Sequence, residues 1–236
     1  MVVASAVAVV IFALAIAARP PTSTPDPISV LRAAAVGYDS DTSGYLVDRV
    51  VETVHAKGGL IAIDRRQRKV QLRKDGEIVV ERDLTGPAQS DATAHGSKSR
   101  PHFVFSNRYI QEYRLAPAPC AQCSDGEAAV SFESSEHDKG HGAGTIVVDL
   151  RRQRVMSVTY RPYVLPDRRM DTGDITIDFG TLAGSWLPVH CHLTFTAHYL
   201  IVHGSGTLDI ASEAARRYSS FDAARAAYSS QEAAAM

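Results

Sequence analysis

Between residues 44 and 210, most of the chain alternates apolar and polar residues with a period of two, which is typical of β-strands. The clearest alternation covers 190–202, where the odd positions are apolar and the even positions as far as His198 are polar. Two segments, 68–84 and 144–164, carry turn residues near their middle and are typical of hairpins. Shorter strand-like runs cover 44–56, 127–134, 174–180 and 206–210.

Helical character is confined to the two ends of this region. Asp26 can cap a short helix that begins near Pro27 and that Gly37 can end. Successive strands are joined without a long helix between them, which disfavours parallel crossovers. The pattern therefore predicts a mainly β fold with a minor α+β character, namely a curved antiparallel sheet or incomplete β-barrel with one short helix near the N-terminus.

Residues 2–18 form an uncharged apolar run, which is short for a membrane-spanning helix of about 20 residues. The run is typical of a secretion signal, although no Lys or Arg precedes it. An uncleaved N-terminal anchor through 2–18 and a buried helix remain as alternatives. A secretion signal and an N-terminal anchor both predict that the rest of the chain is exported, to the periplasm or the extracellular space, where disulfides persist.

The expected organisation has four parts. Residues 1–18 are a signal peptide or anchor and 19–27 are a Pro-rich spacer. Residues 28–222 are a single β domain, within which 116–142 form an insertion rich in Cys and His. Residues 223–236 are an Ala-rich tail that we expect to fray.

Composition restricts the function more than it defines it. The 236 residues carry a formal net charge of −1, with 45% hydrophobic and 22% charged residues, as in ordinary soluble domains. A near-neutral chain argues against nucleic-acid binding, which needs a cationic face. No nucleophile elbow, phosphate-binding loop or dinucleotide fingerprint occurs, so we expect no enzyme and no bound cofactor.

The spacing Cys120-x2-Cys123-x13-His137-x3-His141 lies within the range of a tetrahedral zinc site, so zinc is an alternative cofactor. In an exported protein the two cysteines are instead expected to form a local disulfide, and unrelated surface residues are a third interpretation. Cys191, the third cysteine, lies on the apolar side of its strand and is expected to be a buried free thiol. His190, His192 and His198 lie on the other side, as a polar outer face.

Segments from GTIVVD through RVMSVTY to DFGTLAGSWLP, followed by a long alternating strand and by Tyr218-x2-Phe221, occur in a distinctive order. This order resembles the LolA-like superfamily of periplasmic lipoprotein-carrier and lipid-binding proteins. The resemblance covers 143–222, with a weaker match over 44–84, and its central motif is Gly-Ser-Trp-Leu-Pro at 184–188. The 116–142 insertion is extra, and the charged residues Asp48, Arg49 and Glu52 depart from the pattern of the early strands.

The resemblance implies an unclosed sheet whose concave face shelters an acyl chain. We therefore expect an exported, non-enzymatic binding protein for a lipid or a lipidated protein, in contact with a membrane surface and monomeric. A structural or interaction domain with a filled core, and a zinc protein, are the alternatives. The expected ligand-binding apolar face comprises Met156, Val158, Tyr160, Ile175, Ile177, Phe179, Trp186, Leu193, Phe195, Tyr199 and Ile201.

Overall fold

The computed structural model describes residues 25–59, 61–85, 91–93, 102–138, 140–165, 168–199 and 202–230. Within these ranges the chain forms one eleven-stranded antiparallel sheet and two α-helices. The predicted signal or anchor segment, 1–18, lies outside the described residues. In the part that is described, no helix has the length and apolarity needed to cross a membrane.

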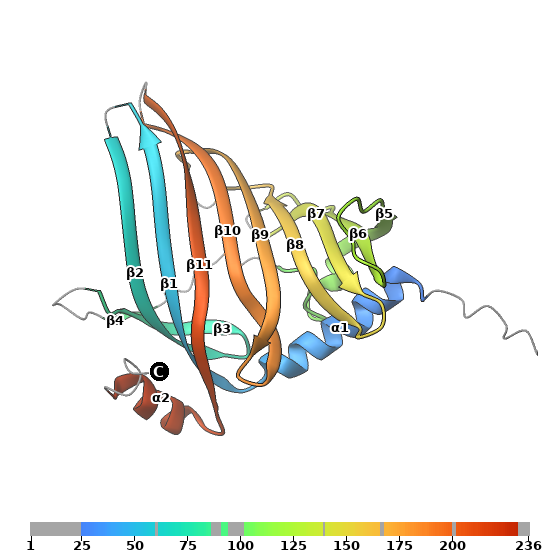
Figure 1. Ribbon diagram of the computed structural model, residues 1–236, viewed down its shortest axis with the longest axis horizontal. Helices are drawn as coiled ribbons and strands as arrows, with labels where there is room; N and C mark the ends of the chain where they lie inside the picture. The colour runs from blue at the N-terminus through green and yellow to red at the C-terminus, as the bar shows by residue number, and fades with distance from the viewer. Residues whose placement is uncertain are drawn as a thin grey trace, which may run out of the picture.

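The sheet is long, curved and open (Figure 1). Its strand order is β4-β3-β2-β1-β11-β10-β9-β8-β7-β6-β5, so the first long strand pairs with the last one and β4 and β5 form the two edges. The elements, in chain order, are α1 (Pro27–Thr42), β1 (Tyr45–Gly58), β2 (Ile61–Lys74), β3 (Glu77–Asp83), β4 (Asp91–Thr93), the 3-10 turn η1 (Ile110–Glu112), β5 (Tyr113–Ala118), β6 (Glu127–Ser134), β7 (Gly142–Asp149), β8 (Arg154–Pro162), β9 (Met170–Leu182), β10 (Ser185–Tyr199), β11 (Val202–Tyr218) and α2 (Phe221–Ser229). The predicted fold class, mainly β with an unclosed antiparallel sheet and a helix near the N-terminus, is confirmed.

Helix α1 begins where the sequence predicts it, because the side chain of Asp26 accepts hydrogen bonds from the backbone N–H groups of Ile28 and Ser29. The expected end at Gly37 is wrong. The helix continues through this glycine to Thr42, and the additional turn places Tyr38 against Phe105. Tertiary packing thus outweighs the cost of about 1 kcal/mol that glycine imposes inside a helix.

Two expected loop or tail segments contain regular structure. The 116–142 insertion includes the end of β5, all of β6 and the first residue of β7. Residues 223–229, expected to fray, belong to α2, where Ala224 and Tyr228 are buried. The N-cap hydroxyl of Ser220 accepts from the backbone N–H of Ala223 and fixes the start of this helix.

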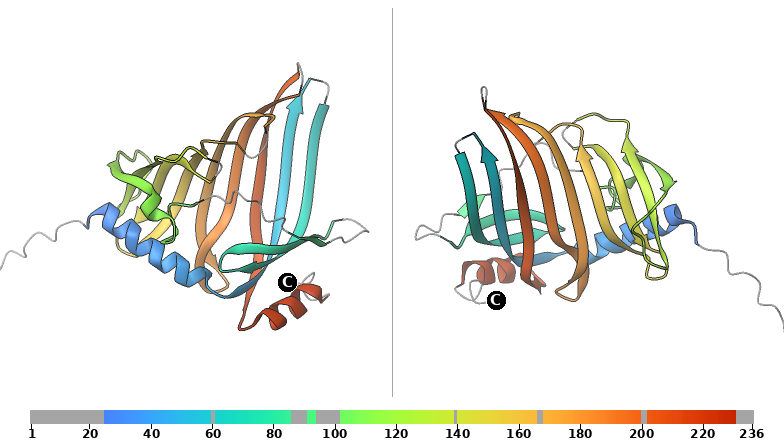
Figure 2. Two further views of the ribbon diagram at one scale, coloured as in Figure 1. Left: turned by 180° about the vertical axis from the view of Figure 1, so that it is seen from behind. Right: turned by 45° about the horizontal axis from the view of Figure 1, so that its top comes forward.

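The two helices pack on opposite faces of the sheet. Helix α2 contacts Val70 and Leu72 of β2, whose side chains alternate with those of Gln71 and Arg73. We call the face that α2 covers the outer face. Helix α1 lies on the other side, the inner face, across the β6–β9 half of the sheet (Figure 2).

The main hydrophobic core fills the inner face between β6 and β9. It combines α1, the segment 103–113 and inward-facing residues of the strands, and its fully buried members include Leu31, Phe105, Ile110, Val130, Ile146 and Val148. This half of the sheet is therefore a packed core. Helix α1 also contacts β10, and the other half of the sheet, formed by β11, β1 and β2, is not covered by this helix.

Candidate functional site

A cavity of ≈ 670 Å³ lies on the inner face at the boundary between the filled and the uncovered half of the sheet. The C-terminal part of α1, the segment 103–109, the β2–β3 hairpin and strands β9, β10 and β11 form its walls. Sites for small ligands have volumes of about 300–1,000 Å³. The volume of this cavity therefore lies within the range of sites that hold small ligands.

One wall of the cavity is apolar. Ile177 on β9, Cys191 on β10 and Ile210 on β11 are direct neighbours across the strands and line the cavity. Phe103 and Phe105 also line it, and their rings stack on each other with centroids 4.8 Å apart. An apolar chain placed between these rings and the sheet would be removed from water on two sides.

The other wall is polar and comes from β2 and the segment 103–109. Gln71, Arg73, Ser106 and Arg108 line it. Arg73 donates from Nη2 to Gln71 Oε1 at 2.7 Å, and its Nη2 lies 3.2 Å from Asp48 Oδ2. Arg108 is 57% exposed and so carries its charge to the rim. The cavity is therefore amphipathic.

The Asp48 carboxyl group is deeply buried beside this polar wall. Its side chain is 1% exposed, and Ser212 donates to Oδ2 at 3.1 Å. Burial raises the pKa of Asp48, an effect that the charge of Arg73 and the hydrogen bond from Ser212 oppose. Asp48 therefore depends on Arg73 for its charge compensation.

Further along the inner face, ionised side chains extend the polar wall away from the cavity. Lys69 Nζ lies 2.6 Å from Glu52 Oε2 and 3.2 Å from Glu81 Oε1. Burial lowers the pKa of Lys69, but its two carboxylate partners outweigh this effect and hold the pKa above its usual value. Gln71 donates to Glu81 at 2.6 Å and so connects this group to the cavity wall. Glu52, like Asp48, is thus paired with a cation.

A second group of polar residues lies where the two ends of the segment 102–112 meet the loop before β7. Glu112 Oε2 lies 2.7 Å from His102 Nδ1 and 2.9 Å from His141 Nε2. The other ring nitrogen of His141 lies 2.7 Å from Asp138 Oδ1. Burial lowers the pKa of His141, but the hydrogen bonds to Asp138 and Glu112 outweigh it and raise the pKa. We call His102, Glu112 and His141 the His–Glu–His cluster.

Most of the predicted apolar face belongs to the core, and one of its residues, Ile177, lines the cavity. Val158, Tyr160, Ile177 and Phe179 are buried, and Ile175 and Trp186 pack against them. Leu193 and Phe195 are half-buried on the uncovered half of β10, beyond the cavity. Met156 sits at a bulge of β8, where the pairing register shifts. The side chain of Tyr199, and Ile201, lie outside the described residues.

The predicted disulfide forms between Cys120 and Cys123, in the connection from β5 to β6. The two sulfurs are bonded to each other, so in this structure neither cysteine offers a free thiolate to the four-residue zinc site that the spacing suggests. His137 instead packs on Tyr163, with ring centroids 4.1 Å apart. His141 lies in the His–Glu–His cluster.

Replacing both Cys120 and Cys123 by Ser is expected to lower the free energy of unfolding by about 2 kcal/mol or less. A disulfide that closes so short a loop removes little entropy from the unfolded chain. Urea unfolding of the oxidised protein and of the double variant checks this. A loss above about 4 kcal/mol would contradict it, and reduction of the wild type is the matched control.

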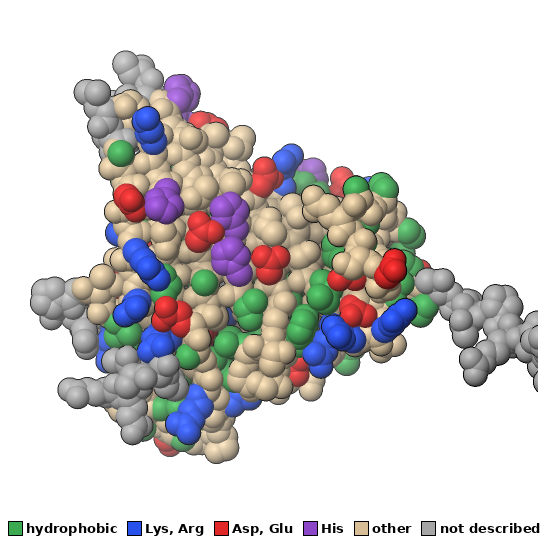
Figure 3. All heavy atoms as spheres, in the orientation of Figure 1, with side chains coloured by type: hydrophobic (Ala, Val, Ile, Leu, Met, Phe, Trp, Pro, Cys, Tyr) green, Lys and Arg blue, Asp and Glu red, His purple; other side chains and the backbone are tan. Residues whose placement is uncertain are grey.

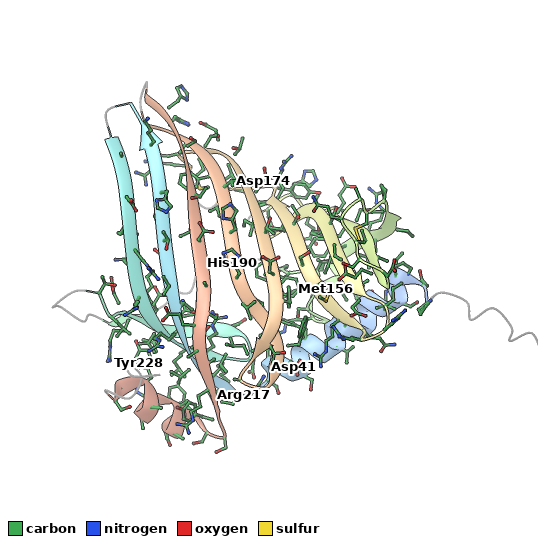
Figure 4. The ribbon with its side chains drawn as sticks, viewed as in Figure 1. Asp41, Met156, Asp174, His190, Arg217 and Tyr228 are labelled. Carbon is green, nitrogen blue, oxygen red and sulfur yellow. A yellow bond between two sulfur atoms is a disulfide. The ribbon has the colours of Figure 1, made fainter. Side chains whose placement is uncertain are left out.

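Histidines and carboxylates alternate on the outer face of β9–β11 (Figure 3). His192 lies 2.6 Å from Asp209, and His190, labelled in Figure 4, lies within 3.4 Å of both Asp178 and Asp209. The hydrogen bond from His192 is the largest cause that lowers the pKa of Asp209. These pairs are consistent with the polar outer face expected for His190, His192 and His198.

The comparisons with known proteins find similar solved structures and no sequence match. No family model matches the chain, and no curated protein matches its sequence. A DUF1329 family protein from Desulfovibrio piger is 13% identical with a TM-score of 0.44, covering 89% of this chain and 99% of its own. A putative outer membrane lipoprotein-sorting protein domain from Vibrio parahaemolyticus is 11% identical with a TM-score of 0.44, covering 88% and 99%.

A LolA superfamily protein from Nitrosomonas europaea is 9% identical with a TM-score of 0.37, and the match covers 87% of this chain and 98% of that one. Since the TM-scores stay below 0.5, the function has to rest on this protein's own residues.

Proposed function

We propose that this protein is an exported, non-enzymatic binding protein that holds the acyl chain of a lipid or of a lipidated protein in the cavity on the inner face. The observation that carries this proposal is the cavity of ≈ 670 Å³ with one apolar and one polar wall. Each methylene group that enters such a wall from water contributes about 0.8 kcal/mol. The apolar wall therefore supplies the affinity.

The polar wall supports an amphipathic ligand rather than a pure hydrocarbon. Ser106 and Arg108 lie beside the two phenylalanines on the same segment, so a polar head group can contact them while the chain contacts the apolar wall. Arg108 is 57% exposed and lies 3.6 Å from Glu77. The head group would lie at this rim and the chain would extend toward Ile210.

The decisive variant is Cys191→Trp, which places an indole ring in the apolar wall. We expect it to weaken binding of a dansyl-labelled fatty acid at least about tenfold, equivalent to 1.4 kcal/mol, because the ring occupies the space that the chain needs. Titration of the delipidated wild type and of the variant, followed by dansyl fluorescence, measures the change.

The matched control is Thr194→Trp, which adds the same ring three positions further along β10 on the outer face, where Thr194 is exposed. This variant should bind as the wild type does. Equal affinity of Cys191→Trp and wild type, or no saturable binding by the wild type, would refute the proposal.

The thiol of Cys191 offers a second measurement in the unmodified protein. It is the free cysteine of the chain, and burial, with smaller effects of Asp209 and Asp178, raises its pKa to about 11. A neutral thiol reacts slowly with disulfide reagents. If the fatty acid occupies the cavity, it should slow this reaction further in proportion to its saturation of the site.

A further inference from the structure

The His–Glu–His cluster brings together two imidazoles and one carboxylate from separate parts of the chain. His102 and Glu112 flank the segment that covers the cavity, and His141 precedes β7. Their ligand atoms, His102 Nδ1, Glu112 Oε2 and His141 Nε2, all lie within 4.8 Å of one another. Two histidines and a glutamate are a ligand set that zinc accepts in proteins, with a further position left open.

Hydrogen bonds from neighbouring residues hold the backbone of both histidines in place. The backbone N–H of His102 donates to the carbonyl of Gly140 at 2.7 Å, and Tyr113 donates its hydroxyl to the carbonyl of His102. The backbone N–H of Tyr163 donates to the carbonyl of His141 at 3.0 Å. Both histidines are therefore fixed at the backbone before any ligand arrives.

Asp138 adds an outer partner of the kind that metal-binding histidines have. Its Oδ1 lies 2.7 Å from His141 Nδ1, which directs Nε2 of the same ring toward Glu112. A carboxylate behind a histidine fixes the ring and strengthens it as a ligand. His141 itself is 1% exposed, whereas His102 and Glu112 are 32% and 33% exposed. An ion could thus enter from the side of His102 and Glu112.

The spacing of the three ligand atoms needs only a small adjustment. A tetrahedral zinc ion with bonds of about 2.0–2.2 Å separates its ligand atoms by about 3.3–3.5 Å. The present separations from Glu112 Oε2 are 2.7 Å and 2.9 Å. Rotation of the partly exposed side chains of His102 and Glu112 can provide the difference.

We infer that His102, Glu112 and His141 form a binding site for a divalent transition-metal ion such as Zn²⁺, with Asp138 as the outer partner of His141. The ion joins both ends of the segment 102–112, whose middle residues line the cavity. It would therefore fasten that segment to the loop before β7. This site differs from the one that the Cys120 and Cys123 spacing suggests.

The test is a titration of the EDTA-treated full chain with Zn²⁺, and in parallel with Co²⁺, whose visible absorption reports nitrogen ligands. We expect one tight equivalent in the wild type and at least about a hundredfold weaker binding in His102→Ala and in Glu112→Gln. Asp138→Asn, which removes only the outer partner, should weaken binding about tenfold. Both His102 and Glu112 are partly exposed, so circular dichroism can establish that these variants fold.

Two controls separate this site from the alternatives. His137→Ala changes an exposed histidine of the same loop, and Cys120→Ser/Cys123→Ser removes the disulfide; both should keep the tight equivalent. A wild type without tight binding, or affinity unchanged in His102→Ala and Glu112→Gln, would overturn the inference. Loss of the tight equivalent in His137→Ala would do so as well. None of these measurements involves a lipid, so the result is independent of the proposed function.

Discussion

Replacing Phe105 by Ala is expected to lower the free energy of unfolding by about 3–5 kcal/mol. Phe105 is 1% exposed and contacts three rings, with centroids 5.0 Å from Tyr38, 4.8 Å from Phe103 and 5.0 Å from Phe179. These rings belong to α1, to the segment 103–109 and to β9. The deletion therefore leaves a void where three parts of the fold meet. Urea unfolding followed through the fluorescence of Trp186, the single tryptophan, measures the loss.

The control for Phe105→Ala is Val36→Ala, which removes an apolar side chain that is 55% exposed on α1. Its effect should stay within about 0.5 kcal/mol. A loss below about 1 kcal/mol in Phe105→Ala would mean that the segment 103–109 is not packed on the sheet. The cavity would then lack one of its two walls.

The segment around Phe105 also shows where local pattern fails as a guide. Residues 102–115 are ambiguous in sequence between a strand and a short helix, and the structure has turns, then η1, then the start of β5. The stacked rings of Phe103 and Phe105 determine this conformation by docking on Phe179 and Tyr160. Such partners are distant in the chain and cannot be recognised from local periodicity.

Hairpins were predictable because their signals are local. The turn at Asp75-Gly76 joins β2 to β3, and both residues have the positive φ, 49° and 83°, that the sequence signal implies. The turn between β7 and β8 likewise contains Gln153, with φ of 52°. At Asp75-Gly76 the residues themselves favour the backbone conformation, so no distant contact has to be known, whereas Gln153 adopts a positive φ that glutamine rarely has.

Strand β11 illustrates the opposite case. The sequence predicts a strand over 206–210, whereas β11 covers Val202–Tyr218. Residues 211–218 are rich in Ala and Arg, which favour helices. They become a strand because β1 pairs with them, from Tyr45 opposite Tyr218 to Val51 opposite Ala211. Strand preference here arises from the partner and not from the residues.

The candidate site was also predictable only in part, because it depends on contacts between residues that are distant in the chain. Alternation places Ile177 on the inner face. Whether it lines the cavity depends on how far α1 and the segment 103–109 extend over the sheet. Arg73, Ser106 and Arg108 were missed. The signal that pointed toward the polar wall was Asp48, a charge within an apolar strand.

The second large effect on stability that we expect concerns the buried charge of Asp48. Replacing Arg73 by Leu is expected to lower the free energy of unfolding by about 3 kcal/mol at neutral pH, because a buried charge that loses its partner is strongly destabilising. Asp48 is 1% exposed and Arg73 is 22% exposed, and Nη2 of Arg73 lies 3.2 Å from Oδ2 of Asp48. Urea unfolding at several pH values measures both the loss and its pH dependence.

The pH dependence identifies the cause of the loss. Burial already raises the pKa of Asp48, and Arg73 opposes that rise, so the variant's folded state should hold the Asp48 proton to a higher pH than wild type does. A carboxyl whose pKa is higher in the folded than in the unfolded state stabilises the fold as pH falls. The loss of unfolding free energy in Arg73→Leu, relative to the wild type, should therefore be greatest well above the folded pKa of Asp48. It should become smaller as the pH is lowered through that pKa. A deficit independent of pH would instead indicate lost packing.

Two further variants complete this experiment. Adding Asp48→Asn to Arg73→Leu removes the unpaired charge, so stability at neutral pH should partly return and the pH dependence should disappear. Arg114→Leu breaks an ion pair with Glu133 in which the side chains are 82% and 55% exposed, and it should change stability by at most about 1 kcal/mol. The contrast follows from burial, because water compensates Glu133 when its partner is lost but cannot reach Asp48. Arg73 therefore has two roles. It lines the cavity, and it compensates the buried charge of Asp48 on which the stability of the fold depends.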